Sequence, residues 1–455
     1  MSDRPNILLV ITDQQNANML SCAGNRYLRT PALDSIARRG ARFERAYCMN
    51  PMCVPSRFSL FTGRRGSAIG LLNNKDDHIS ELPATIRNNA LGWLMRGAGY
   101  QTAYGGKTHF PLGLTPEDYG FETISRDDRD KLAGDCARFL ARDHSKPFLL
   151  VASFINPHDI CHMAIRDFAE TPLERRLSQP DRIELRELDA ALQLPDGVTE
   201  EEFFRTVCPP LPGNFDVSPD EAEAIGLMQA RSPFKAKARQ RYSERDWRRH
   251  RWAYARLTER VDSQIGRVLE ALQDNQLADD TVVIFTSDHG DMDASHRMEH
   301  KTAFYEEAAR VPLLIAGPGL AGGAVDDRRL VSNGLDLLPT CCAVAGLEPP
   351  ADLEGRSLLP LLAAAPAAAW RDALPLESEL GQMVIGQDAK YMRYYQGARR
   401  EQLIDLAADP GEMRNAVADA AQRQRLGELR AAFASLFPAA HDPYARKGGA
   451  AEKLQ

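Results

Sequence analysis

The sequence predicts an α/β fold in which helices sandwich a large, mixed, mostly parallel sheet, followed by a small C-terminal α+β domain with an antiparallel sheet. Continuous apolar runs of strand length alternate with segments of helical spacing, and four of the runs end in polar clusters. The 455 residues exceed one ordinary core, and the composition changes after Pro349-Pro350. We therefore expect a large domain over residues 1–348, with an insertion at about 160–245, and a small domain over 349–455.

The first part of the chain alternates strands and helices. Apolar runs typical of buried strands cover residues 7–12, 41–47, 101–104 and 147–154. Helical spacing and terminal signals predict helices over residues 31–40, 53–62, 91–99 and 130–143. The proposed insertion is rich in Pro, Glu and Arg, which favours short helices and loops.

Regular structure returns after the insertion with an apolar stripe at helical spacing between Leu257 and Leu272. Further strands are predicted at 281–287 and 311–316, and a helix at 335–345. The small domain is predicted to hold strands at 383–385, 390–395 and 401–405 and a helix at 420–437. We expect a loosely ordered tail after Pro438.

The composition of the chain limits which partners and which cellular compartment we expect. A net charge of −7 gives no reason to expect nucleic acid or an anionic membrane as a partner, and no apolar run is long enough to span a bilayer. The eight cysteines are scattered, without zinc or disulfide spacing, and no secretory apolar segment precedes the first strand. We therefore expect a cytoplasmic protein, and a homo-oligomer stays open.

The stretch that begins at Cys53 predicts a nucleophile beside an anion site. Pro55 suits the first turn of a helix that Gly63 can end, so Cys53 would lie at a helix N-terminus, where backbone N–H groups favour an anion. Arg57 lies one turn further along, and its guanidinium could return to the same place.

Four predicted strands end in polar side chains that are far apart in the sequence. These residues are Asp13, Gln14, Lys107, His109, His158, Asp288 and His289. Ligands of open α/β sheets bind outside the carboxyl ends of the strands, so we expect these side chains to converge on one site.

The run from Cys53 to Arg57, with Phe-Thr-Gly-Arg ending at Arg64, resembles the signature of type I sulfatases in the alkaline phosphatase superfamily. The alternative, a core cysteine beside a chance motif, is much weaker. The resemblance implies an alkaline-phosphatase-like fold and the oxidation of Cys53 to formylglycine (3-oxoalanine) by a formylglycine-generating or sulfatase-maturing enzyme. It also implies that the hydrated aldehyde attacks sulfur and later expels sulfate, a release step for which a plain cysteine lacks the second hydroxyl.

The resemblance also implies a divalent metal ion. The ligands it indicates are Asp13, Gln14, residue 53, Asp288 and His289, with Asp291 behind them. Gln14 replaces an acid and His289 an amide of the usual pattern, variations similar to those of choline sulfatases and phosphonate monoester hydrolases. Imidazole suits transition metals and carboxylates suit hard ions, so Ca²⁺ and Mn²⁺ both stay open, with Mg²⁺ a further alternative. For the Asp-Gln pair alone, a strand-ending turn is an equal alternative.

The resemblance to the family also implies roles for the remaining charged residues and histidines. Arg57, Lys107 and Lys301 would neutralise the sulfate oxygens, as a transition state of shifting charge requires. His158 is the candidate acid for the leaving alcohol, and His109 would orient the hydrate or the sulfate. Each histidine taken alone could equally be structural.

Several features do not belong to these motifs. Asn73, Asn74 and the three residues after them follow the signature helix and could line the pocket or form a polar loop, and His296 could meet the organic part of a substrate. The basic run 239–252 is either a platform for a polyanion or, in our preferred interpretation, a solvated helical face.

Three functions follow from the sequence. The first is hydrolysis of a sulfate ester, with a small-molecule or saccharide sulfate as substrate and a sugar sulfate as the leading one. The second is hydrolysis of phosphonate monoesters or phosphodiesters with the same aldehyde, which Gln14 and His289 keep open. The third is non-catalytic anion binding by an unconverted Cys53, which the acid–base histidines argue against.

Overall fold

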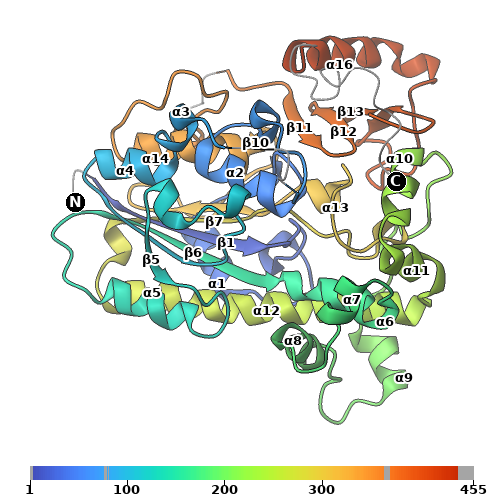
Figure 1. The fold of residues 1–455 in the computed structure, drawn as a ribbon, viewed down its shortest axis with the longest axis horizontal. Helices are drawn as coiled ribbons and strands as arrows, with labels where there is room; N and C mark the ends of the chain where they lie inside the picture. The colour runs from blue at the N-terminus through green and yellow to red at the C-terminus, as the bar shows by residue number, and fades with distance from the viewer. Residues whose placement is uncertain (1–3, 76–78, 80, 363–368, 439–455) are drawn as a thin grey trace.

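The computed structural model describes residues 4–75, 79, 81–362 and 369–438 and is built on an eight-stranded sheet of order β5-β4-β6-β1-β7-β8-β2-β9 (Figure 1). Its strands are β1 (Asn6–Asp13), β2 (Gly40–Phe43), β4 (Gln101–Gly106), β5 (Glu122–Ser125), β6 (Phe148–Pro157), β7 (Thr281–Ser287), β8 (Leu313–Ala316) and β9 (Ala324–Asp326). Only β8 runs antiparallel to its neighbours, so the prediction of a mixed, mostly parallel sheet is confirmed.

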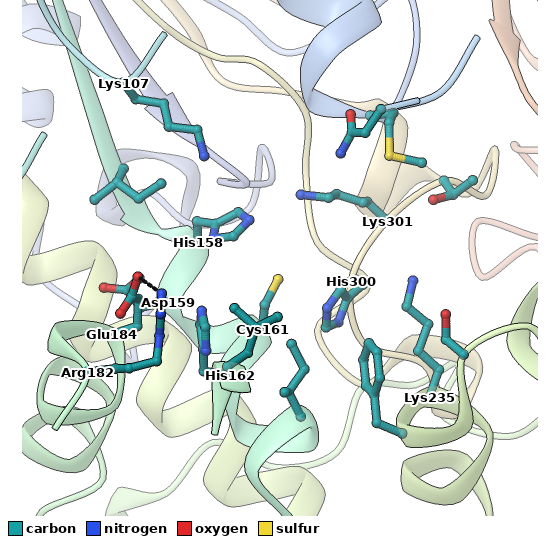
Figure 2. Close-up of a pocket in the computed structure, with 18 of the residues that line it drawn as sticks. Lys107, His158, Asp159, Cys161, His162, Arg182, Glu184, Lys235, His300 and Lys301 are labelled. Carbon is teal, nitrogen blue, oxygen red and sulfur yellow. Dashed lines mark hydrogen bonds and ion pairs between the residues drawn. The ribbon is translucent and has the colours of Figure 1, made fainter. Parts of the chain in front are cut away.

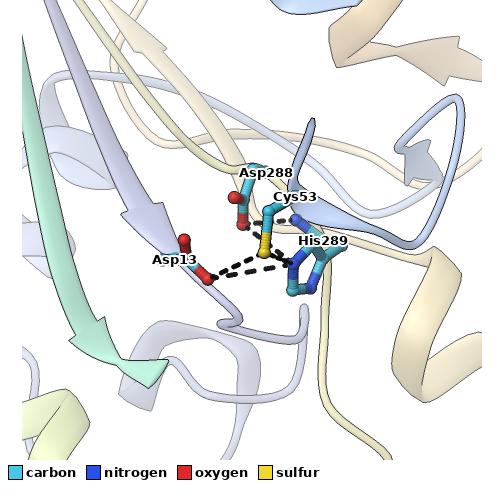
Figure 3. Close-up of side chains that lie close together, drawn as sticks. All are labelled: Asp13, Cys53, Asp288 and His289. Carbon is cyan, nitrogen blue, oxygen red and sulfur yellow. Dashed lines mark hydrogen bonds and ion pairs between the residues drawn. The ribbon is translucent and has the colours of Figure 1, made fainter. Parts of the chain in front are cut away.

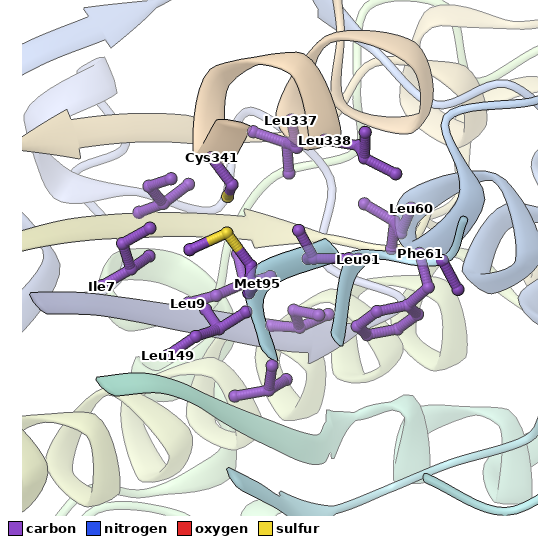
Figure 4. Packing of buried hydrophobic residues seen from close by; sticks show 14 of the residues in the cluster. Ile7, Leu9, Leu60, Phe61, Leu91, Met95, Leu149, Leu337, Leu338 and Cys341 are labelled. Atoms are coloured by element: carbon purple, nitrogen blue, oxygen red, sulfur yellow. The ribbon is translucent and has the colours of Figure 1, made fainter. Parts of the chain in front are cut away.

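Helices cover both faces of this sheet. One face carries α2 (Cys53–Thr62), α4 (Leu91–Gly97) and α14 (Asn333–Val344), and the other carries α1 (Pro31–Arg39), α5 (Leu132–Leu140) and α12 (Glu244–Asp274) (Figure 1). Ile7 and Leu9 of β1 pack toward Leu60 and Met95 on the first face (Figure 4), whereas Leu8 packs on the second. Strand side chains alternate between the two faces, so a strand buried on both sides needs the continuous apolar run seen in the sequence.

The insertion folds as predicted, as short helices joined by loops. These are α6 (His162–Phe168), α7 (Pro172–Leu177), α8 (Ile183–Ala191), α9 (Glu200–Glu202), α10 (Glu223–Ala230) and α11 (Pro233–Arg241). They pack largely against α12 and against each other.

Both interpretations of the basic run 239–252 need correction. Arg248 donates to the Pro209 carbonyl at 2.9 Å, and Arg251 pairs with Asp293 at 3.1 Å. Trp247 and Trp252 of the same run are buried. The run is therefore neither a free platform nor a solvated face, because many of its cations bind the insertion to α12.

The C-terminal part forms the predicted antiparallel sheet, covered by α16 (Arg423–Leu436) (Figure 1). Its strands are β11 (Leu374–Ser378), β12 (Gly381–Ile385), β13 (Ala389–Tyr394) and β14 (Glu401–Asp405). The sequence analysis missed β11, and the domain boundary at residue 348 stays a prediction. The tail from residue 439 onward lies outside the described residues. Among the described helices, none combines the length and apolar character that a bilayer crossing needs.

The predicted single strand over 41–47 is wrong, because the chain turns between β2 and β3 (Ala46–Tyr47). β2 belongs to the large sheet, whereas β3 pairs with β10 (Val331–Ser332) in a separate two-stranded sheet. Arg45 fixes the turn by donating to the Gly386 carbonyl at 2.9 Å. The turn leads the chain toward Cys53.

A buried ion-pair cluster connects the C-terminal sheet to the segment that follows Lys301. The fully buried ammonium of Lys390 lies 2.7 Å from Glu306 and 2.9 Å from Glu412. We expect Lys390→Met to lower the free energy of unfolding by about 3 kcal/mol, because two carboxylates lose their buried counter-ion. Denaturant unfolding measures this, with exposed Lys146→Met as the control expected within about 0.5 kcal/mol of the wild type. Equal stability of both variants would contradict the expectation.

His250 on α12 predicts a specific acid sensitivity. Its two ring nitrogens are buried without a hydrogen-bond partner, and burial lowers its pKa to about 3 from 6.5, with the Arg251 charge acting in the same direction. Between pH 6.5 and pH 3 the unfolded chain therefore binds more protons than the folded one. Lowering the pH from 7.5 to 5 should therefore reduce the free energy of unfolding by about 2 kcal/mol through this group. We expect His250→Leu to lose less stability than the wild type over that interval in denaturant unfolding. A loss as large as that of the wild type would refute the assignment.

Candidate active site

Four buried side chains meet at the carboxyl ends of β1 and β7. Asp13 ends β1, Asp288 and His289 follow β7, and Cys53 opens α2. Their potential ligand atoms all lie within 4.8 Å of one another (Figure 3). β1 and β7 pair in parallel up to Thr12 and Ser287, so residues that are distant in sequence reach the same sheet edge. The structure thus brings together Asp13, Asp288 and His289 of the predicted strand-end set, and Cys53 joins them.

The Cys53 thiol is surrounded by polar groups. Its sulfur lies 3.2 Å from His289 Nε2, 3.1 Å from Lys301 Nζ and 3.8 Å from Asp13 Oδ1. Burial and the Asp13 charge raise the pKa of this thiol, but the charges of Lys301 and His289, with a hydrogen bond from His109, bring it well below its usual value. The site therefore favours an ionised oxygen or sulfur at residue 53.

Arg57 occupies a different place from the one predicted. Its guanidinium is fully buried and donates to Asp288 Oδ2 at 2.9 Å and to Asp13 Oδ2 at 3.2 Å. It also donates to Ser153 Oγ at 2.9 Å and to the Lys107 carbonyl at 3.1 Å. The prediction that Arg57 faces the substrate anion is corrected, because these acceptors hold the guanidinium behind the carboxylates.

Gln14 connects the nucleophile region to the residues behind it. Its side-chain oxygen accepts from Lys301 Nζ at 2.7 Å, and its Nε2 donates to Asp291 Oδ2 at 2.6 Å. The chain leaves β1 at Gln14 itself, with φ of 70°, so that the side chains of Asp13 and Gln14 both reach the site. Asp291 thus lies behind Gln14 as expected, while metal ligation by Gln14 stays a prediction.

Gly290 makes the corresponding turn after β7 possible. A Cβ there would lie 1.9 Å from the Glu307 carbonyl oxygen, so no larger residue fits without displacing the backbone. The side chains of Asp288 and His289 are thereby held at the sheet edge.

The donor set fits one divalent cation. Two carboxylates, an imidazole and the side chain of residue 53 lie within ligation range, and all four residues are buried. Burial and the Asp13 charge raise the pKa of Asp288 to about 6, which indicates an excess of negative charge that a cation would relieve. His289 Nδ1 donates to the Gly290 carbonyl at 2.9 Å, which leaves Nε2 directed at the cluster.

A cavity of about 540 Å³ opens beside these residues (Figure 2). Lys107, His158 and Lys301 line it, and Lys107 Nζ lies 3.3 Å from Asp13 Oδ2. Burial lowers the pKa of His158 to about 4, with Lys301 and Lys107 adding to the effect against Asp13. Lys107, His158 and Lys301 therefore face one space, whereas Arg57 and His109 are not part of the described cavity lining. The roles of all five residues stay predictions.

The residues predicted with less specific motifs, Asn73, Asn74 and His296, differ in whether they reach the cavity. Asn74 lines the cavity, and its oxygen accepts from the backbone N–H of Val54 at 3.0 Å. Asn73 accepts from the backbone N–H of Lys75, and residues 76–78 lie outside the described part of the chain. His296 is corrected: its ring is buried and stacks on Tyr305 at 3.8 Å, and it is absent from the described cavity lining.

The sequence analysis missed most of the opposite cavity wall. The lining residues it did not identify include Arg129, Asp159, Cys161, Arg182, Glu184, Lys235 and His300. All but Arg129 and His300 lie in or next to the insertion, where no spaced motif marks them. The single available signal was the position of the insertion after the strand that ends near His158.

Comparisons with known proteins agree with this geometry. The profile of the sulfatase family matches residues 5–347, and that of the N-sulphoglucosamine sulphohydrolase C-terminal region matches 294–437. The chain is 29% identical to a Delta 4,5-hexuronate-2-O-sulfatase of Bacteroides thetaiotaomicron, over 97% of this chain and 90% of that protein. A solved 2-O GAG sulfatase is similar with a TM-score of 0.79 and 27% identity, over 97% of this chain and 94% of the other.

The fold is also shared with a phosphonate monoester hydrolase of Agrobacterium radiobacter. That structure has a TM-score of 0.73 and 23% identity, over 96% of each chain. At this identity the likeness shows the fold alone, which is the alkaline-phosphatase-like arrangement that the sequence predicts.

The imidazole of His289 predicts which metal the site prefers. We expect His289→Asn to shift bound metal from Mn²⁺ toward Ca²⁺, since an amide oxygen is the harder ligand. Elemental analysis of protein equilibrated with equal Mn²⁺ and Ca²⁺ measures the ratio. His144→Asn, whose ring lies 3.0 Å from the Phe139 carbonyl and outside the cluster, is the control. An unchanged ratio in His289→Asn would rule out His289 as the selecting ligand.

Proposed function

Because the chain belongs to the sulfatase family, we propose that it removes the sulfate group from a sulfated sugar, with residue 53 as formylglycine and a divalent cation beside it. The family match makes the protein a sulfuric ester hydrolase. The observation that supports the rest is the meeting of Asp13, Cys53, Asp288 and His289 at one sheet edge, with two lysines facing the same space.

The lysines suit a sulfate ester. Lys301 lies between Gln14 and residue 53, and burial tends to lower its pKa while the Cys53 and Asp13 charges raise it well above its usual value. Lys107 reaches the same region from the end of β4. Two fixed cations would bind the non-bridging sulfate oxygens and stabilise the charge that shifts onto them in the transition state.

Asp13, Asp288 and His289 would hold the cation, with Ca²⁺ and Mn²⁺ as the proposed identities. When bound, such a cation makes a coordinated hydroxyl more acidic. His158 is proposed to hand a proton to the leaving alcohol. Its imidazole is neutral near pH 7 in the free protein, and the charge of a bound sulfate ester would raise its pKa toward the range that such a donor needs.

The substrate class rests on the relatives. One relative is named a Delta 4,5-hexuronate-2-O-sulfatase and one similar structure a 2-O GAG sulfatase, which supports a sugar as the organic part. The proposal also requires a maturing enzyme that converts Cys53. The phosphonate and diester alternative has weaker support, because the likeness to the phosphonate hydrolase shows the fold alone.

A rate comparison on protein with a confirmed aldehyde at residue 53 tests the reaction. An aryl sulfate is compared with the matching aryl phosphonate and phosphodiester. We expect sulfate to have the highest kcat/KM and Cys53→Ala to lose at least about 10³-fold of it, because the nucleophile is removed. Preference for phosphonate or diester would overturn the sulfatase proposal. Equal rates for Cys53→Ala and converted protein would return residue 53 to a non-catalytic role.

A further inference from the structure

The charged side chains that line the cavity are unevenly paired. Five Lys and Arg side chains and three Asp and Glu side chains are in its lining. Arg129 lies 2.7 Å from Asp159 and 3.0 Å from Asp128, and Arg182 lies 2.7 Å from Glu184. The three acids of the lining are thus engaged by arginines of the same wall.

The lysines of the lining differ from one another. Lys107 pairs with Asp13, and Lys301 binds Gln14 and Cys53. The Lys235 side chain makes neither a hydrogen bond nor an ion pair with any described residue, and its Nζ lies 6.0 Å from the centre of the Phe234 ring. In Figure 2, Lys235 stands on α11, across the cavity from Arg182 and Glu184.

The acids that act on Lys235 from a distance are already occupied. Glu379 lies 3.9 Å from Arg231, and Asp291 accepts from Gln14 and from the backbone N–H of His300. Burial lowers the pKa of Lys235, and the Lys301 charge adds to this effect. The side chain of Lys235 is half-buried in the cavity wall and faces no described counter-ion, so an anion that entered the cavity would bind there.

The first turn of α11 adds to this preference. Ser232 and Lys235 both line the cavity, and the first turn contains no acidic residue. The Ser232 side chain makes no capping hydrogen bond, so its hydroxyl is available to a ligand. The positive end of the helix dipole therefore acts in the same direction as the ammonium.

We propose that Lys235 binds a second anionic group of the substrate, a carboxylate or a second sulfate, while the scissile sulfate lies at Lys107 and Lys301. This inference rests on the proposed function and deepens it: the substrate is a sugar with at least two anions. Lys235 would then determine specificity without touching the reacting atoms.

The experiment compares wild type with Lys235→Gln, both with the aldehyde confirmed. The substrates are a neutral-hexose monosulfate, a uronic acid monosulfate and a disulfated glucosamine. We expect the ratio of kcat/KM for a two-anion sugar to that for the neutral-hexose monosulfate to fall about tenfold or more in Lys235→Gln, mainly through KM, because a charge-assisted hydrogen bond is lost. The uronate and disulfate arms show which anion is bound. Lys235→Arg, which keeps the charge, should restore part of the ratio.

Lys237→Gln is the matched control, because Lys237 lies on the same helix and pairs with Glu170 away from the cavity lining. It should leave the ratio unchanged. An unchanged ratio in Lys235→Gln, or an equal loss on all three sugars, would overturn the assignment of Lys235. Absence of sulfate release from every sugar by converted wild type, with hydrolysis of phosphonate instead, would identify a failure of the proposed function.

Discussion

The buried guanidinium of Arg57 is the interaction on which the site depends. It binds Asp13 after β1, Asp288 after β7, Ser153 on β6 and the Lys107 carbonyl beyond β4. Four strands and the helix that begins with Cys53 are thus fixed to one planar group, and the fork of donors on arginine suits this task better than the single ammonium of lysine. The cost of burying this charge is offset because both carboxylates face it directly. The signature arginine therefore holds the strands and the carboxylates of the site together.

The same arrangement explains the charge state of the site. Burial raises the pKa of carboxylates, yet the charges of Lys107, His158, Lys301 and Arg57 hold the pKa of Asp13 well below its usual value. Burial and the Asp13 charge instead raise the pKa of Asp288 above its usual value. The pKa values of these two adjacent carboxyl groups are thus shifted in opposite directions, so the pair keeps a negative charge near neutral pH. The divalent cation that we propose for these ligands would balance this charge, and residue 53 lies in the same cluster.

The features of the fold and the site that could be predicted from the sequence are those determined by neighbouring residues in the chain. β1, β7 and α2 are local patterns of apolar runs and terminal signals, so their ends and the meeting of Asp13, Cys53, Asp288 and His289 were predictable. The burial of Arg57 was not, because it depends on acceptors from β6 and from beyond β4. His296 and the basic run were misjudged for the same reason: Tyr305 and the insertion cover them, and no local spacing reveals tertiary partners.

The cavity has a floor and a wall with different origins. The floor is made of residues at strand ends, held by backbone pairing and by Arg57. The wall comes largely from the insertion, where Arg182, Lys235 and their neighbours are positioned by short helices packed on α12. The arginines of the basic run hold that packing from behind, through hydrogen bonds such as those from Arg248 to the Pro209 carbonyl and from Arg251 to the Pro210 carbonyl. Because the wall can change without disturbing the strand ends, the chemistry and the choice of substrate are structurally separable in this fold.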